Sequence, residues 1–205
     1  MSDFTYDSKK TVNTAEIYEL YEWDNVWIDH ANDCSFRRIL YIGDSISCGV
    51  RRRATALTNE GILFDGFGTS KALDNPFFKD SVKLFMRQLP KIDTVIFNNG
   101  LHGWHLDDAS DYKNLYEDMV KFLLDELNGN KLFIVFTTSL RDEERNKRVI
   151  ARNLAAAEIA KKYSLPTIDL YTVTNQNIDM LISDGVHPND SLNDKIATEI
   201  IRCVE

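Results

Sequence analysis

Short apolar runs alternate with stretches of helical periodicity along most of the chain. Uninterrupted apolar runs are typical of strands buried on both faces, and apolar residues spaced three or four apart are typical of amphipathic helices. The expected strands are 38–42, 61–65, 93–99, 132–137 and 165–170. The expected helices are 14–21, 46–57, 75–89, 112–127, 142–163 and 192–203.

This alternation predicts an α/β fold: one five-stranded parallel sheet with helices on both faces, in a single domain over 1–205. Residues 1–36 are expected to pack on that domain as a helical and aromatic extension. The glycine-rich stretch 66–70 is expected to be a turn after the second strand. Ligands of such sheets bind beyond the carboxyl ends of the strands.

The composition limits the kinds of ligand and partner that we expect for this protein. The chain has 205 residues and a net charge of −8, so a general affinity for nucleic acid or anionic membranes is not expected. Its one basic cluster, Arg51–Arg53, is expected to be a solvated helix face. Three cysteines without paired spacing indicate neither a disulfide framework nor a zinc site.

The sequence shows neither the pattern of a membrane-spanning helix nor that of a secretory signal peptide. No apolar run approaches the roughly 20 residues that span a bilayer, and the first ten residues are polar. We therefore expect a cytoplasmic protein, with a removed signal peptide as the alternative. The sequence leaves the oligomeric state open.

A candidate nucleophile follows the first expected strand. Ser45 comes directly after Gly43 and Asp44, where the apolar run ends and a helix begins. A hydroxyl on a tight strand-to-helix turn is presented at the carboxyl edge of a parallel sheet. The alternative is that Ser45 only caps the helix, since serine is a favoured N-cap residue.

A candidate acid–base pair lies before the last helix, in Asp184-Gly185-Val186-His187-Pro188. An aspartate three residues before a histidine on a tight turn can accept from the imidazole Nδ1–H, which leaves Nε2 free as a base. Together with Ser45, this pair would complete a Ser-His-Asp triad in one domain.

These two motifs resemble those of the SGNH hydrolases, the GDSL-type esterases and lipases. Gly43-Asp44-Ser45 matches the nucleophile block of that family, and Asp184 to His187 matches its Asp-x-x-His block. The resemblance implies a flavodoxin-like three-layer α/β/α sandwich and a serine esterase mechanism without a metal or other cofactor. It also implies that Ser45 is the nucleophile, His187 the general base and acid, and Asp184 the orienting carboxylate.

The two middle blocks of the family match less well. In the third block, Gly100-Leu101-His102-Gly103 stands in register with Gly-x-Asn-Asp, so His102 takes the place of the asparagine that donates to the oxyanion. Asn99, just upstream, is the alternative donor. In the second block the donor is a backbone N–H, of Gly68 by residue type or of Ser70 by counting from Asp65.

The leading hypothesis is a serine ester hydrolase that acts on a small or carbohydrate-linked acyl ester, for instance an acetyl group. The first alternative is a binding protein that kept the fold and lost turnover through its altered oxyanion block. The second alternative, a flavodoxin-like nucleotide binder, is weakened because no glycine-rich phosphate-binding motif follows the first strand. Trp104 and His105 beside the third block suit either substrate contact or loop packing.

Overall fold

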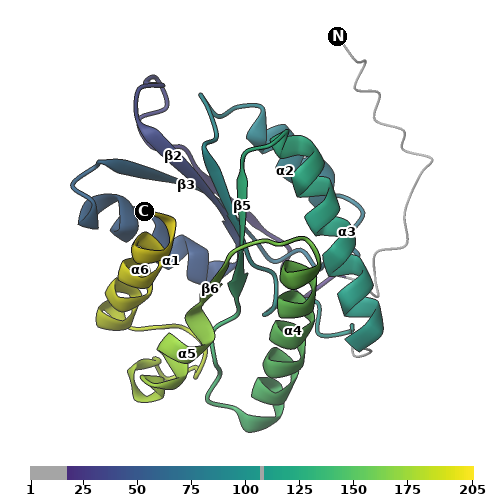
Figure 1. Ribbon diagram of the computed structural model, residues 1–205. Helices are drawn as coiled ribbons and strands as arrows, with labels where there is room; N and C mark the ends of the chain where they lie inside the picture. The colour runs from purple at the N-terminus through teal and green to yellow at the C-terminus, as the bar shows by residue number, and fades with distance from the viewer. Residues whose placement is uncertain (1–17, 107–108) are drawn as a thin grey trace.

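A six-stranded sheet lies between two layers of helices in the computed structural model, which describes residues 18–106 and 109–205 (Figure 1). The strands are β1 (Asp24–Trp27), β2 (Arg37–Gly43), β3 (Ile62–Thr69), β4 (Thr94–Phe97), β5 (Lys131–Phe136) and β6 (Thr167–Asp169). Their spatial order is β1-β3-β2-β4-β5-β6. Strands β2 to β6 run parallel, and β1 joins the edge antiparallel to β3.

The helices cover both faces of the sheet, as predicted. On one face lie α1 (Ser45–Leu57), α5 (Leu170–Asn175), α6 (Asp190–Val204) and a 3₁₀ turn at Ile178–Met180; on the other lie α2 (Phe78–Met86), α3 (Ala109–Leu127) and α4 (Glu143–Lys162) (Figure 1). Each face has its own hydrophobic cluster. The α/β fold class is therefore confirmed, and no helix in the described ranges is long and apolar enough to cross a bilayer.

Strand β2 is the centre of this arrangement. Its apolar side chains alternate between the two clusters: Ile39 and Tyr41 enter one, and Leu40 and Ile42 enter the other. All four are at most 2% exposed, which explains why the sequence shows an apolar run instead of alternation. The strand ends at Gly43, where a Cβ would lie 2.9 Å from Ser47 Cβ, so a glycine is needed for α1 to begin this close to the strand.

The predicted strand count was wrong because β1 was not recognised. This strand has four residues, all exposed, and so carries neither an apolar run nor a buried alternation. The stretch 66–70, expected to be a turn, instead continues β3 through Thr69 and pairs with β1. Its glycines reflect close packing: a Cβ would lie 2.3 Å from Arg51 Cδ at Gly66 and 2.3 Å from Cys48 Sγ at Gly68.

Other element boundaries also differ from the prediction. The expected helix 14–21 falls partly outside the described residues, and the described part, 18–21, is not helical. The expected helix 75–89 is shorter, because Asn75 and Pro76 form a turn that precedes α2. Helix α5 was not predicted: it begins at Leu170, which had been assigned to the last strand.

The basic cluster of α1 is solvated only in part: Arg52 is exposed, but Arg51 is buried and all three arginines make contacts within the protein. Arg51 is only 4% exposed and donates to the backbone and side-chain oxygens of Asn25 in β1, at 3.0 and 2.6 Å. Arg52 lies over the Trp27 ring at 4.7 Å. Arg53 pairs with acidic residues of α6. The three cations therefore hold β1 and α6 against α1.

A buried ion pair joins the second and third strands of the chain. Arg38, which is fully buried, donates to both carboxylate oxygens of Asp65 at 3.0 Å. Its other terminal nitrogen donates to the carbonyls of His30 and Asp33. Burial raises the pKa of Asp65, against the opposing effect of hydrogen bonds from the Asp29 N–H and from Arg38. The pair thus fixes the loop that leads from β1 into β2.

We expect Arg38→Met to lower the free energy of unfolding by about 3–5 kcal/mol, because it leaves the Asp65 carboxylate buried and unpaired. Urea denaturation measures the loss. Lys113→Met is the control: it removes an exposed ion pair to Glu158 and should cost less than about 1 kcal/mol. Equal losses in the two variants would contradict a structural role for the buried pair.

Candidate active site

Ser45 lies where the predicted strand-to-helix turn places it. It is the first residue of α1 and is half-buried, directly beyond the carboxyl end of β2. Asp44 is the N-cap, and its Oδ1 accepts from the Ile46 N–H at 2.9 Å. Because Asp44 supplies the cap, the hydroxyl of Ser45 is free for another partner. The N–H groups of the first helical turn have no partner within the helix, so the Ser45 N–H also points toward this edge.

Three side chains from distant parts of the sequence form a hydrogen-bonded chain at this edge. Ser45 Oγ lies 2.7 Å from His187 Nε2, and His187 Nδ1 lies 2.7 Å from Asp184 Oδ2. The other oxygen of Asp184 accepts the backbone N–H groups of Val186 and His187, at 2.8 and 2.9 Å. The structure therefore brings together the three residues singled out from the sequence.

The charge on Asp184 is strongly favoured. Partial desolvation opposes ionisation, but hydrogen bonds from the His187 and Val186 N–H groups and from the imidazole, together with the charge of His187, lower the pKa of Asp184 to about 2. The carboxylate is thus an acceptor at any pH near neutrality. It orients the imidazole so that Nδ1 faces Asp184 and Nε2 faces Ser45.

The loop that carries Asp184 and His187 is held by its own backbone and by Arg141. The Ile182 N–H donates to the His187 carbonyl at 2.8 Å, and Gly185 takes a φ of +71°, which favours glycine. Arg141, between β5 and α4, donates its N–H to the Gly185 carbonyl at 2.9 Å. Its guanidinium donates to the carbonyls of Leu181 and Ile182. Sequence reasoning missed Arg141, since nothing near it in the sequence marks its partners.

The backbone N–H groups of Gly68 and Ser70, the second-block candidates for the oxyanion donor, face the N-terminal segment. The Ser70 N–H donates to the Trp23 carbonyl at 3.1 Å, and Ser70 Oγ accepts from the Trp23 N–H at 2.9 Å. Gly68 pairs with Asn25 two positions along the same antiparallel ladder. Since hydrogen-bonded pairs alternate in such a ladder, the Gly68 N–H also faces β1. Neither N–H expected for the oxyanion is free in this conformation.

Asn99 and His102 follow β4 at the same edge of the sheet. Asn99 is 3% exposed, and its Nδ2 donates to the Lys71 carbonyl at 2.9 Å, so it ties two site loops together. His102 is mostly buried, and its Nδ1 lies 3.0 Å from Glu19 Oε2. The Trp23 ring packs edge-on against the imidazole. Among the described residues, His102 Nε2 has no hydrogen-bond partner, so this ring nitrogen can take another.

The pKa of His102 is raised. Burial lowers it, but the hydrogen bond from the ring to Glu19 and the negative charges of Asp44, Glu19 and Glu22 outweigh burial. Glu19 also accepts the Gly103 N–H with its other oxygen, at 3.3 Å. One carboxylate from the N-terminal segment therefore fixes both the ring and the backbone of the third block, which the sequence did not reveal.

Arg152 shapes the loop that carries His102. It is 4% exposed, and it donates to the carbonyls of Gly100, His102 and Gly103 at 3.0, 2.7 and 2.6 Å. Its guanidinium also lies 4.8 Å from the centre of the Trp104 ring. Trp104 thus packs on α4, which agrees with the loop-packing interpretation of that residue. His105 likewise pairs with a loop residue, through Nε2 to Asp74 at 2.8 Å.

Within the described residues, no group of three or more His, Cys, Asp or Glu side chains is placed to hold a metal ion. The candidate site therefore contains the Ser45 hydroxyl hydrogen-bonded to the His187 imidazole, which is hydrogen-bonded in turn to the Asp184 carboxylate. It also contains the His102 imidazole, which is held by Glu19. Such a set can activate a hydroxyl and stabilise a developing negative charge.

Comparison with known proteins supports the fold. No protein-family model and no curated protein matches the chain. Several solved structures do. One is a putative GDSL-like lipase from Parabacteroides merdae, with 15% identity and a TM-score of 0.65 over 82% of this chain and 94% of that one. Others are a lipase/acylhydrolase from Enterococcus faecalis, with 18% identity and a TM-score of 0.63 over 82% and 94%, and the acetyl xylan esterase AlAXEase, with 17% identity and a TM-score of 0.62 over 82% and 100%. This chain has the fold of the GDSL-like lipases and acylhydrolases.

Proposed function

We propose that the protein is a serine ester hydrolase in which Ser45 is the nucleophile, His187 the general base and acid, and Asp184 the orienting carboxylate. The observation that carries this proposal is the continuous chain of 2.7 Å contacts from Ser45 Oγ through the imidazole to Asp184. A serine that only capped the helix would need no imidazole at hydrogen-bonding distance, and the cap here is Asp44.

The proposed reaction has two stages. His187 Nε2 takes the proton of Ser45 as Oγ bonds to the acyl carbon, and the protonated imidazole then gives that proton to the departing alcohol oxygen. In the second stage His187 takes a proton from water as the water oxygen bonds to the acyl carbon. The bond from the acyl carbon to Ser45 Oγ then breaks, the imidazolium returns its proton to Oγ, and the acid is released. Asp184 stays ionised throughout, and its charge stabilises the imidazolium that forms in each stage.

The oxyanion of each tetrahedral intermediate needs donors other than the Gly68 and Ser70 N–H groups. We propose the Ser45 N–H, at the N-terminus of α1, and His102 Nε2. Glu19 accepts from Nδ1 and raises the pKa of His102, which favours the charged imidazole, and in that form the other ring nitrogen carries a hydrogen that it can donate. A charged donor suits a developing alkoxide better than a neutral amide does.

The substrate class we propose is a small or carbohydrate-linked acyl ester, such as an acetyl ester. Similar structures include an acetyl xylan esterase and an acetyl esterase mutant solved with acetate ion. The second candidate function is a binding protein without turnover. It is favoured by one observation: β1 and the residue before it occupy both backbone N–H groups of the second block.

We expect Ser45→Ala to abolish hydrolysis of p-nitrophenyl esters, because it removes the attacking oxygen. The free energy of unfolding should fall by no more than about 1 kcal/mol, which is the usual contribution of an N-cap. Even that cap is retained here, because Asp44 still caps α1. Assays with esters of increasing chain length, with wild type and Ser45→Ala in parallel, test the loss of hydrolysis, and urea denaturation of the same two proteins tests the change in stability. Ser47→Ala is the matched control for losing a serine hydroxyl near this turn, because Ser47 is two residues further along α1 and is buried. Wild-type turnover in purified Ser45→Ala would exclude Ser45 as nucleophile.

Asp184→Asn should lower kcat by about 10⁴, because an amide nitrogen facing the ring would favour the imidazole tautomer with its hydrogen on Nε2. The backbone contacts of the side-chain oxygen can persist, so the loop should keep its conformation. Steady-state kinetics measures the effect, and circular dichroism checks the fold. A kcat within about tenfold of wild type would mean that Asp184 does not orient a catalytic base.

His102→Ala should lower kcat by about 10²–10³ with little change in KM, because an oxyanion donor acts mainly in the transition state. His102→Asn should recover much of that loss by restoring an N–H donor. Asn99→Ala is the comparison, since it removes an amide at the same edge that already donates to the Lys71 carbonyl. A normal His102→Ala with an inactive Asn99→Ala would make Asn99 the donor, and wild-type rates in both would exclude both residues as oxyanion donors.

A further inference from the structure

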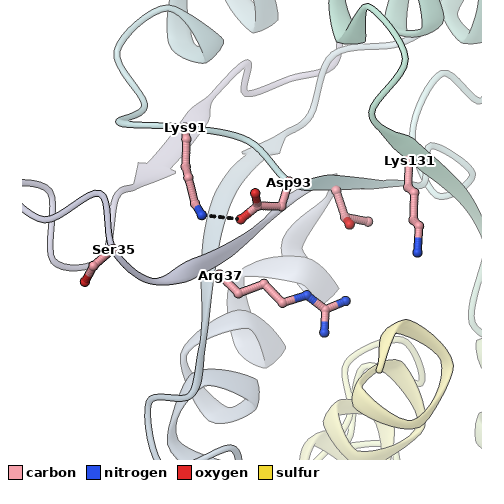
Figure 2. A pocket seen from close by; sticks show the side chains of 6 residues that line it. Ser35, Arg37, Lys91, Asp93 and Lys131 are labelled. Atoms are coloured by element: carbon pink, nitrogen blue, oxygen red, sulfur yellow. Dashed lines mark ion pairs between the residues drawn. The ribbon is translucent and has the colours of Figure 1, made fainter.

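A hollow lies at the opposite edge of the sheet from Ser45. It is a cavity of about 350 Å³ at the amino ends of β2, β4 and β5 (Figure 2). Its lining residues are Ser35, Arg37, Lys91, Asp93, Thr94 and Lys131. Nothing in the proposed esterase mechanism uses it, because that mechanism lies at the carboxyl ends of the strands.

The strand register places three of these residues on one face. Thr94 is the register partner of both Ile39 in β2 and Lys131 in β5. Arg37 lies two positions before Ile39, and side chains two apart in a strand point to the same side. Arg37, Thr94 and Lys131 therefore line one face across three adjacent strands. Figure 2 shows the Arg37 and Lys131 side chains extending away from the Lys91–Asp93 ion pair.

The cavity carries an excess of positive charge in a chain whose net charge is −8. Its one carboxylate, Asp93, is already used: Oδ2 accepts the Arg38 N–H at 2.8 Å and lies 3.1 Å from Lys91 Nζ. Arg37 donates from one terminal nitrogen to the Val204 carbonyl. Across residues 18–106 and 109–205, no carboxylate lies within ion-pairing distance of Arg37 or Lys131. Two cations thus face the cavity without a counter-charge.

We propose that this cavity binds the phosphate group of a small molecule. A guanidinium offers paired donors that match phosphate oxygens, and lysine ammonium groups on either side add point charges. The hydroxyl residues Ser35 and Thr94 add neutral donors. A volume of about 350 Å³ is at the lower end for small-molecule sites and leaves room for a sugar attached to the phosphate.

Isothermal titration calorimetry at low ionic strength tests the proposal, with inorganic phosphate and ribose 5-phosphate as separate probes. Lys131→Gln is the decisive variant, because this side chain is exposed at the start of β5 and its loss should leave the fold unchanged. We expect it to weaken binding by about tenfold, the effect of losing one charge-assisted contact. Tighter binding of ribose 5-phosphate would assign a phosphate ester, and equal binding would assign free phosphate.

Lys161→Gln is the matched control, because it makes the same charge change at the exposed end of α4. It should leave both affinities unchanged, and neither variant should alter ester hydrolysis. Absence of heat with both probes up to millimolar concentration would overturn the proposal. Equal weakening by Lys131→Gln and Lys161→Gln would overturn it too, because it would reduce the effect to net charge.

Discussion

The burial of β2 on both faces is the constraint on which the rest of the molecule depends. With four consecutive side chains at most 2% exposed, the strand has no place for a functional group along its length. Chemistry is therefore confined to its two ends. At the carboxyl end the chain turns through Gly43 into α1 and presents Ser45, and at the amino end Arg37 enters a basic cavity.

The ion pair that lies inside the sheet, Arg38 with Asp65, has its charges fully buried. Arg38 is fully buried, yet it is stabilised by two contacts to Asp65 and by two backbone carbonyls. A buried charge is tolerated when its partners satisfy it, and its partners here come from the loop before β2 and from β3. These contacts offset the cost of desolvating the charges, and they also fix the position of the segment that precedes β2. That segment continues back to the residues that contact the candidate site.

Two other arginines connect sites that lie far apart in the sequence. Arg141 holds carbonyls of the loop with Asp184 and His187, and Arg152 holds carbonyls of the loop with His102. Loop backbones that leave a sheet edge cannot pair with neighbouring strands, so their carbonyls need other donors. A guanidinium suits this task because it presents five N–H groups in a fixed plane. Each candidate loop thus has a defined conformation without any substrate.

The sequence predicted much of this architecture because the signals were local. Apolar runs marked the parallel strands, and the short motifs around Ser45 and His187 marked side chains that the structure brings together. What the sequence did not predict depends on contacts between distant segments. The strand β1 has no buried face of its own. Gly66 and Gly68 were predicted to be turn residues because the local sequence does not show which side chains pack against them. Those side chains are Arg51 and Cys48. Glu19 became part of the site only through a partner 83 residues away.

The separation of Ser45 from His187 by 142 residues also bears on how the protein is made. A chain that emerges from the ribosome N-terminus first can pair β2 with β3 and β4 early, because those strands are close in sequence. Asp184 and His187 follow β6 in the sequence, so they emerge after all six strands of the sheet. A nascent chain can therefore form its sheet while Ser45 is still without its imidazole partner, so the contact between Ser45 and His187 forms late in the assembly of this domain.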